Sequence, residues 1–377
     1  MGGMSVKKII SLLLCAAALT GCAGLNGKNA VRTNDKTIKV AVFQNSGEKQ
    51  ENFEKGIELA YEDVLQEYKD SGYKIECDFY DNLETYEDVQ RITDTLVADP
   101  SVTAIIGSDT DSICENQAVK AQNNGKLFIC PMWVNDEAML PSQDMVFSML
   151  YSNYDMSRAL KKTVDDMPDM RWAVCVSNDG ICSNEAQSFR MQDAQNVVDY
   201  CDMNDLRLYF DRITDRWRNL GVGGVVFLPY SERYFDLFRK LKTYMPELYF
   251  VCDFDMDMPQ MYEGNEAAYK NVYLVDGFYV DGDADDIKRL YEESHVIDTW
   301  TVHGYNTLRM IVDTAVRNGT NDPKRIASIL HDTGYDGAGQ TFKFDSSGLI
   351  EPVKFSYSAI DSLEAVLMDA RSEVVGK

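Results

Sequence analysis

The chain has 377 residues, a length at which two or three domains are expected. Its hydrophobic fraction of 45% and charged fraction of 26% are ordinary for a globular protein, which excludes a disordered chain, a collagen and a disulfide-stapled miniprotein. The 37 Lys and Arg residues against 61 Asp and Glu residues give a net charge of −24. Because no run of basic residues interrupts this acidity, we do not expect nucleic-acid binding.

The first residues have the pattern of a bacterial export signal. Two lysines precede an apolar segment, residues 9–19, which suits a signal peptide and is too short to span a bilayer. The segment ends in Leu-Thr-Gly-Cys22, which resembles the lipobox of bacterial lipoproteins. We therefore expect removal of the lipoprotein signal peptide, residues 1–21, a membrane anchor of diacylglycerol and palmitate on Cys22, and a polar tether over 22–36. An ordinary secretory signal or a buried short helix is the alternative.

From residue 37 onwards, short apolar strands alternate with amphipathic helices. Strands are predicted at 38–43, 73–80, 102–106 and 127–130, and helices at 48–68, 86–98 and 112–124. Strands of four to six apolar residues between amphipathic helices indicate a parallel sheet covered on both faces. No later segment approaches eighteen uninterrupted apolar residues, so no transmembrane helix is expected.

A second unit of the same kind begins after Phe147. Its predicted strands are 172–176, 206–210, 225–228 and 248–252, and its predicted helices are 183–196 and 231–244. The remaining chain predicts helices at 284–293, 304–317 and 323–331 and strands at 341–344 and 352–358. The fold class is therefore α/β, with two doubly wound parallel-sheet lobes.

The cysteines beyond residue 22 indicate buried thiols rather than chemistry. Seven remain, so at least one is unpaired, and Cys77, Cys130, Cys175 and Cys252 lie in apolar strand-like runs. No Cys-x-x-Cys or Cys/His spacing suggests zinc binding or redox work. We expect mostly free structural thiols.

Several stretches resemble one known family. They are residues 53–60, which are similar to its first helix, 104–108 and 128–131, which are similar to its third and fourth strands, and the segments 304–307 and 335–348. Their order and spacing, together with the lipobox, resemble the type I periplasmic binding proteins, in the branch of Leu/Ile/Val-binding lipoproteins that serve ABC transporters. The resemblance covers nearly the whole chain after the signal.

The resemblance implies two lobes joined by three crossovers, with the ligand between them. On this basis lobe one is 37–146 plus 275–340, and lobe two is 147–274 plus 341–377. Open α/β sheets bind ligands beyond the carboxyl ends of their strands, so the residues that follow each strand are the candidates for ligand contact.

The loop after the third strand carries Ser108, Thr110 and Ser112. In the family, the matching loop binds the carboxylate of the ligand through hydroxyl groups and the amides of a helix N-terminus, which favours an anion. The alternative is that Asp111 or Ser112 only caps the following helix, and capping does not exclude ligand contact.

The loops after four other strands differ from the family or match it only in part. Trp133 and Val134 stand where the family has a small residue and a headgroup-binding Thr; Trp133 is either lobe packing or a stacking surface in the cleft. Asp179 lies where the family often has Tyr-Gly. Tyr230 follows another strand, and Asp253 matches the usual acidic partner of an ammonium group, with a solvated loop charge as the alternative. Tyr151 and Tyr279, near the expected crossovers, are either hinge packing or ligand contacts.

Other chemistries have weak support. Asp281, Asp283 and Asp285 have the spacing of a calcium loop, but Asp286 occupies the position that requires Gly, and capping of the next helix explains these acids. The three histidines lack catalytic spacing. We expect no enzyme activity, no metal and no cofactor.

The sequence thus predicts a lipoprotein on the extracytoplasmic face of a bacterial cell membrane. It would capture a small molecule, an amino acid or an amine-like solute, for an ABC permease. The alternative is a ligand-sensing or regulatory lipoprotein of the same fold that acts on a membrane or cell-wall partner.

Overall fold

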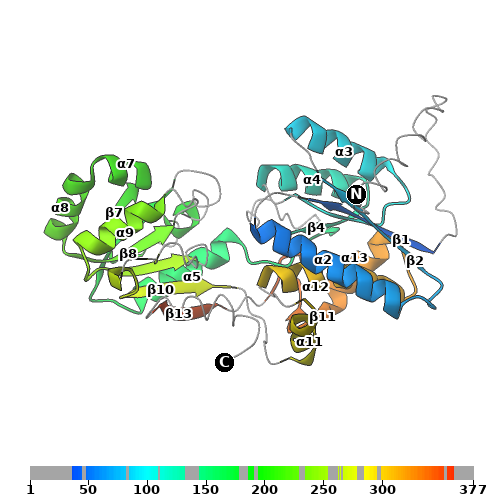
Figure 1. The fold of residues 1–377 in the computed structure, drawn as a ribbon. Helices are drawn as coiled ribbons and strands as arrows, with labels where there is room; N and C mark the ends of the chain where they lie inside the picture. Colours follow the sequence, from blue (N-terminus) through cyan, green and yellow to red (C-terminus); the bar gives the residue numbers. More distant parts are fainter. Residues whose placement is uncertain are drawn as a thin grey trace, which may run out of the picture. The chain divides into compact units, whose positions relative to one another are not determined.

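The fold is described from a computed structural model, drawn in Figure 1. The structure describes residues 36–44, 48–81, 85–108, 111–131, 144–177, 186–190, 194–228, 234–253, 262, 264, 266–277, 284–294, 299–351 and 355–360. Among these residues, no helix combines the length and the apolar character needed to cross a membrane.

The first sheet has five parallel strands in the order β2-β1-β3-β4-β5. They are β1 (Thr37–Phe43), β2 (Lys74–Tyr80), β3 (Ala104–Ile106), β4 (Leu127–Cys130) and β5 (Val146–Ser148). Successive residues of a strand face opposite sides of the sheet, so Val40 and its neighbour Ala41 belong to two different apolar clusters. Both faces of the sheet are therefore buried, as the continuous apolar runs predict.

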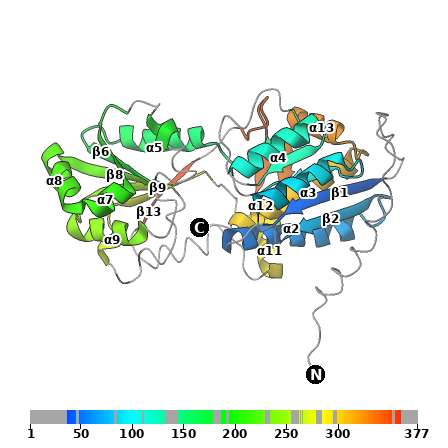
Figure 2. The ribbon, with the colours of Figure 1, turned by 90° about the horizontal axis from the view of Figure 1, so that it is seen from above.

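Helices cover both faces of this sheet. They are α2 (Glu48–Glu67), α3 (Tyr86–Ala98), α4 (Asp111–Asn123), α11 (Asp285–Ser294), α12 (Thr299–Arg317) and α13 (Pro323–Thr333). The cluster on the Val40 side includes Ile57 of α2 and Leu308 of α12, whereas the opposite cluster includes Val89 of α3 and Ala118 of α4. Figure 1 and Figure 2 show the two helix layers on either side of the sheet.

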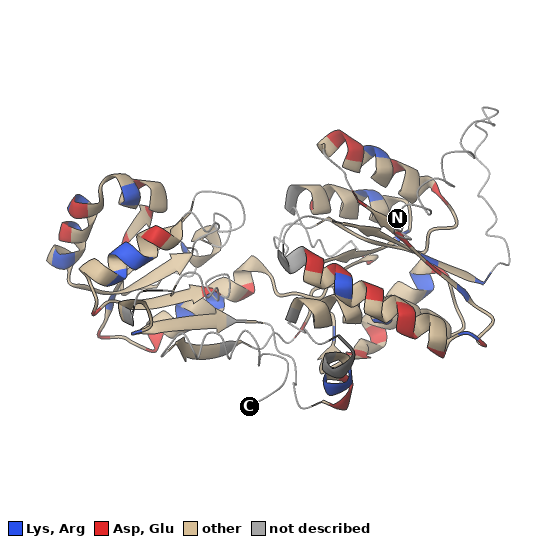
Figure 3. Ribbon diagram, viewed as in Figure 1, with Lys and Arg blue, Asp and Glu red and all other residues tan. Residues whose placement is uncertain are grey.

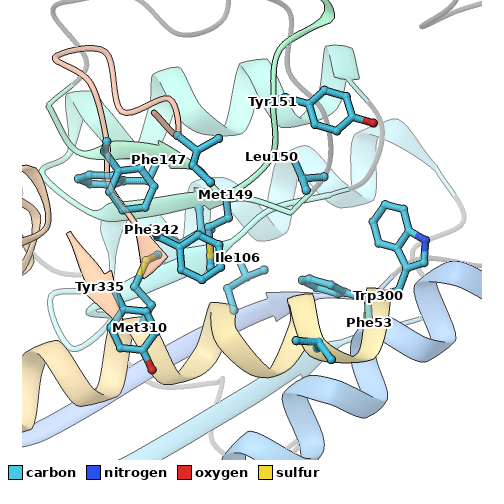
Figure 4. Packing of buried hydrophobic residues seen from close by; sticks show 14 of the residues in the cluster. Phe53, Ile106, Phe147, Met149, Leu150, Tyr151, Trp300, Met310, Tyr335 and Phe342 are labelled. Atoms are coloured by element: carbon cyan, nitrogen blue, oxygen red, sulfur yellow. The ribbon is translucent and has the colours of Figure 1, made fainter. Parts of the chain in front are cut away.

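Two glycines bring α2 and α12 unusually close together. A Cβ atom on Gly56 would lie 1.9 Å from the carbonyl oxygen of Thr301, and one on Gly304 would lie 1.9 Å from that of Phe53. Only glycine allows the two backbones to touch in this way. The approach seats Phe53 beside Trp300 in the apolar cluster shown in Figure 4.

The second sheet has six strands in the order β13-β10-β9-β8-β6-β7. They are β6 (Arg171–Val176), β7 (Val197–Asp202), β8 (Val222–Leu228), β9 (Tyr249–Asp253), β10 (Val272–Asp276) and β13 (Ser356–Ile360). All neighbours are parallel except β13, which is antiparallel to β10. Helix α5 (Asn153–Asp165) packs on one face, and the apolar cluster of the other face includes residues of α7 (Met203–Leu208), α8 (Phe210–Leu220) and α9 (Phe235–Tyr244).

The prediction of a strand at 206–210 is wrong, because this segment is helical. The side chain of Asp202 accepts hydrogen bonds from the N–H groups of Asn204 and Asp205 and so starts α7. Leu206 and Phe210 are both buried, and their separation of four residues fits a strand face, but in the structure they belong to two successive helices, α7 and α8. The strand of this region is β7, which the apolar pattern missed because five of its six residues are only partly buried. Helix α8 was missed with it.

Most other expected elements are confirmed. Helix α3 and strand β4 have the predicted bounds, and α2, α4, α11 and α13 begin and end within two residues of them. Strands β5 and β10 were not predicted. The expected helix at 183–196 lies partly outside the described residues, and its described part, 186–190, is helical. A short hairpin of β11 (Tyr335–Gly337) and β12 (Gln340–Phe342) and a single 3₁₀ turn, Glu266–Ala268, complete the described elements.

The chain changes sheet three times. It leaves the first sheet after Ser148, returns after β10 to the helices that cover this sheet, and crosses to the second sheet again between Ile350 and β13. Before the last change, Leu349 forms a bridge with Ser148 of β5. The predicted lobe boundaries at residues 146 and 340 remain predictions, but the two parallel-sheet units of the expected fold class are present.

Candidate ligand-binding site

The carboxyl ends of adjacent strands bring two groups of candidate residues to sheet edges. In the first sheet, Ser108 follows β3 and Pro131 follows β4. In the second sheet, Ser177 follows β6 and Asp253 ends β9, with β8 between them. Because parallel strands end at the same edge of a sheet, each group lies on a single edge, where ligands of open α/β sheets bind.

Only part of the predicted site falls within the described residues. Ser108 and Asp253 are described, and Ser112 lies in the first turn of α4, where the backbone alone is described. Thr110, Trp133, Val134, Asp179 and Tyr230 lie outside the described residues, as do Tyr279, Asp281 and Asp283. Among the described residues, no group of three or more His, Cys, Asp or Glu side chains could hold a metal ion.

Ser108 is held in place by a glutamine that the sequence patterns did not indicate. The backbone N–H of Ser108 donates a hydrogen bond of 2.8 Å to Oε1 of Gln117 on α4. Nε2 of Gln117 donates in turn to Oγ1 of Thr93 on α3, at 3.2 Å. Ser108 is 4% exposed and Gln117 is fully buried. The start of the predicted ligand loop is therefore fixed by a buried polar chain that runs through two helices.

A buried histidine fixes the end of β4, next to the segment that carries Trp133 and Val134. Nε2 of His303 lies 2.9 Å from the carbonyl oxygen of Pro131. Its ring lies between Phe53, at a centroid distance of 5.3 Å, and Trp300, at 6.1 Å. Burial lowers the pKa of His303 to about 4, so the ring is neutral at pH 7 and its Nε2–H donates to Pro131. The sequence did not indicate a role for His303, because its hydrogen-bond partner is 172 residues away in the chain.

Asp253 brings a carboxyl group to the edge of the second sheet. The residue is 5% exposed, and its position on β9 is opposite Val275 of β10. At the same edge, after β6, the fully buried Ser177 donates its backbone N–H to the carbonyl of Leu228, at 3.2 Å. The contact of Asp253 with an ammonium group of the ligand stays a prediction, with a solvated loop charge as the alternative.

The three chain crossings pack against one another around Tyr151. This residue, which follows β5, is 1% exposed and its ring lies 5.2 Å from that of Phe355, just before β13. Gly277, just after β10, lies so close that a Cβ atom there would be 2.3 Å from Cδ1 of Tyr151. Within the described residues, the Tyr151 ring therefore contacts the other two crossings, as a residue that packs in the hinge would.

A separate cavity of about 500 Å³ lies between α2, α11, α12 and β11. At its base the carboxylate of Asp313 accepts hydrogen bonds from Tyr68 and Tyr335, both at 3.0 Å, and contacts Arg309 and Arg317 at 3.1 and 3.2 Å. Burial raises the pKa of Asp313, an effect that the two arginines oppose. These groups satisfy one another, so the cluster ties α12 to α2 and β11.

A second carboxylate in this cavity is also bound by a tyrosine and an arginine. Asp63 accepts a hydrogen bond of 2.6 Å from the hydroxyl of Tyr305 and one of 2.9 Å from Arg289, which links α2 to α12 and α11. None of the residues that line this cavity belongs to the predicted ligand site.

Charge is distributed unevenly over the molecule. Helix α2 carries seven acidic and two basic residues, whereas α9 carries one acidic and three basic residues. Figure 3 shows the acidic positions, in red, repeated along the α2 ribbon. Two of these acids are paired with arginines, since Asp63 contacts Arg289 at 2.9 Å and Glu67 contacts Arg309 at 2.8 Å.

Comparison with known proteins gives a family and a fold. The sequence profile of the periplasmic binding protein family matches residues 37–349. A sequence search against curated proteins finds no match.

Several solved structures share the fold. A leucine-binding protein, LivK from Thermotoga maritima, is 14% identical, with a TM-score of 0.71 and coverage of 86% of this chain and 96% of that one. LivJ from Streptococcus pneumoniae, in complex with isoleucine, is 16% identical, with a TM-score of 0.68 and coverage of 86% and 100%. A solute-binding protein from R. palustris, in complex with benzoate, is 14% identical, with a TM-score of 0.66 and coverage of 86% and 93%.

Proposed function

The chain belongs to the periplasmic binding protein family, and we propose that it captures a small solute outside the cytoplasm and delivers it to an ABC importer. The observation that carries the proposal is the presence of buried polar residues, Ser108 and Asp253, at the carboxyl ends of strands in two separate parallel sheets. One such edge alone would be a weak binding surface, whereas two facing edges can surround a solute.

Each sheet with its helices acts as one lobe, and the crossings around Tyr151 act as the hinge. A solute that contacts both lobes favours the closed state, and the permease recognises that state. Small-angle X-ray scattering with a binding solute tests this mechanism. We expect a smaller radius of gyration and a higher Tm on binding. Tight binding without compaction would contradict the two-lobe clamp.

The protein is held at the extracytoplasmic face of the membrane by a lipid on Cys22. The support is the Leu-Thr-Gly-Cys pattern after a short apolar segment. Cys22→Ser should give an unlipidated precursor or a released protein, and membrane fractionation measures this. A variant that is still fully lipidated and retained would refute the anchor.

A second candidate function is a ligand sensor or regulator of the same fold. It is favoured by Trp133 and Val134, which replace the small residue and Thr expected of an amino-acid carrier. Cross-linking of the ligand-loaded protein in cells distinguishes the two functions. Recovery of a permease subunit supports transport, whereas recovery of a kinase or a wall synthase supports regulation.

A further inference from the structure

Two cysteines of the second sheet lie side by side on neighbouring strands. Cys175 on β6 is the direct register partner of Cys201 on β7. Their Sγ atoms are 3.5 Å apart. Neighbouring strands lie about 4.8 Å apart, which falls within the span of about 4.4–6.8 Å between the Cα atoms of a disulfide. A small rotation of the two side chains would bring the sulfur atoms to bonding distance.

Both thiols are in the apolar cluster under α7, α8 and α9. Cys175 is fully buried and Cys201 is 7% exposed. The sequence pattern had indicated free structural thiols, and the structure contains both sulfurs as free thiols.

We propose that Cys175 and Cys201 form a disulfide bond when the protein folds outside the cytoplasm. That the protein folds outside the cytoplasm rests on the proposed function, whereas the closeness of the two sulfur atoms does not. The bond would fasten the edge strand β7 to the interior of the sheet and close a loop between residues that are 26 apart in sequence. Closing such a loop restricts the unfolded chain and so stabilises the fold.

The reaction is a thiol–disulfide exchange with a disulfide oxidant, for which oxidised glutathione is a suitable probe. A thiolate of one cysteine attacks the oxidant, breaking its S–S bond, forming a mixed disulfide and releasing one glutathione thiolate. The second cysteine, as thiolate, attacks the protein sulfur and releases the other glutathione. In sum, two protein thiols lose two electrons and two protons, and one glutathione disulfide becomes two glutathione thiols.

The bond should form during folding rather than afterwards. Burial raises the pKa of the Cys175 thiol, so the reactive thiolate is scarce once the strands are packed. An oxidant added to the folded, reduced protein should therefore act slowly. The same oxidant present during refolding should act before the core closes.

The test is refolding of the purified protein from denaturant, with a mixture of oxidised and reduced glutathione in one arm and with reductant alone in the other. Free thiols are then alkylated under denaturing conditions, and the protein is cut with trypsin. We expect the oxidised arm to contain fragment 172–190 linked to fragment 191–207, 2 Da lighter than the two reduced peptides together. We expect its Tm to exceed that of the reduced arm by about 5 °C.

Cys182 provides the matched control, because it shares the tryptic fragment of Cys175. The linked pair should persist in Cys182→Ala and disappear in Cys175→Ala and in Cys201→Ala. If both cysteines are alkylated after oxidative refolding of the wild-type protein, the proposal is wrong. This outcome is measured on the wild-type protein, so it does not depend on whether the cysteine variants fold.

The same peptide analysis of protein isolated from cells tests separately whether the two cysteines can form the bond and whether the protein folds in an oxidising compartment. The linked pair in both the refolded and the isolated protein supports the proposal in full. A linked pair after refolding but free thiols in protein from cells would overturn the bond in the cell, and would count against an oxidising extracytoplasmic location rather than against the geometry.

Discussion

Gly277 is in contact with Tyr151 at a distance that leaves no room for a side chain. A Cβ atom on Gly277 would lie 2.3 Å from Cδ1 of Tyr151 and 2.9 Å from Cε1 of Phe355. Each of the three residues lies on a different crossing between the two sheets. The three crossings are therefore packed as one unit, and a change at one of them reaches the other two. Figure 4 shows Tyr151 next to Leu150 among the labelled residues of the large apolar cluster.

Gly277→Ala should destabilise the protein by about 2–3 kcal/mol, because the added methyl group must displace an aromatic ring. Urea unfolding measures the change. Gly223→Ala is the matched control, since its Cβ would meet only the flexible side chain of Met170, at 3.2 Å. Truncating the ring with Tyr151→Ala should make the Gly277 substitution nearly harmless. Additive effects of the two changes would contradict the packing argument.

Gln117→Leu should weaken both stability and ligand affinity. The substitution leaves the buried N–H of Ser108 without its acceptor, which costs about 1–3 kcal/mol, and it frees the loop that we expect to contact the ligand. We expect affinity to fall about tenfold, as measured by calorimetry. Thr93→Ala is the control, because it removes only the far end of the hydrogen-bonded chain. Unchanged affinity in Gln117→Leu would leave Gln117 as part of the core only.

His303 should make the fold sensitive to acid. Its pKa is about 4 in the folded protein and about 6.5 when unfolded, so the unfolded state binds the extra proton between these values. Stability is therefore fully present above pH 6.5 and falls as pH drops towards 4, by about 2–3 kcal/mol at pH 4.5. Urea unfolding at several pH values measures this.

His303→Gln keeps an N–H donor for Pro131 and removes the titrating group. Its free energy of unfolding should fall less between pH 7 and pH 4.5 than that of the wild-type protein, by the amount attributed to His303. Equal pH dependence in the two proteins would show that the ring does not change protonation in this range.

The elements that sequence predicted well are those whose burial is regular. β4, with four fully buried residues, and α3, with Thr85 as its N-cap and a buried apolar stripe, were predicted with their actual bounds. β7 and α7 were not, because a half-exposed edge strand lacks an apolar run and because Leu206 and Phe210 fit either period. A local pattern cannot distinguish these cases, since the deciding contacts come from elsewhere in the chain.

The strand ends that carry Ser108 and Asp253 were predictable from sequence, whereas the residues that support these strand ends were not, and the ligand contacts themselves stay predictions. Ser108 and Asp253 follow from the rule that ligands bind at the carboxyl ends of strands. Gln117 and His303 do not, because a buried amide or imidazole has no sequence period and acts through one tertiary hydrogen bond each to the predicted loops. Loops that bind ligands are positioned by such contacts, and only the fold brings them together.

The identity of the solute gives the last prediction. An aliphatic amino acid needs a carboxylate site free of competing acid, but Asp109 and Asp111 follow Ser108 directly in the sequence. If Trp133 lines the cleft, as the sequence suggests, its aromatic face would attract a cation by about 0.5–2 kcal/mol, and the predicted partner of Asp253 is an ammonium group. We therefore expect a cationic, amine-bearing or aromatic solute rather than Leu, Ile or Val. A thermal-shift panel followed by calorimetry tests this, with Trp133→Ala losing affinity and Trp133→Phe retaining most of it. Low-micromolar binding of Leu or Val that is indifferent to Trp133→Ala would restore the ordinary family specificity.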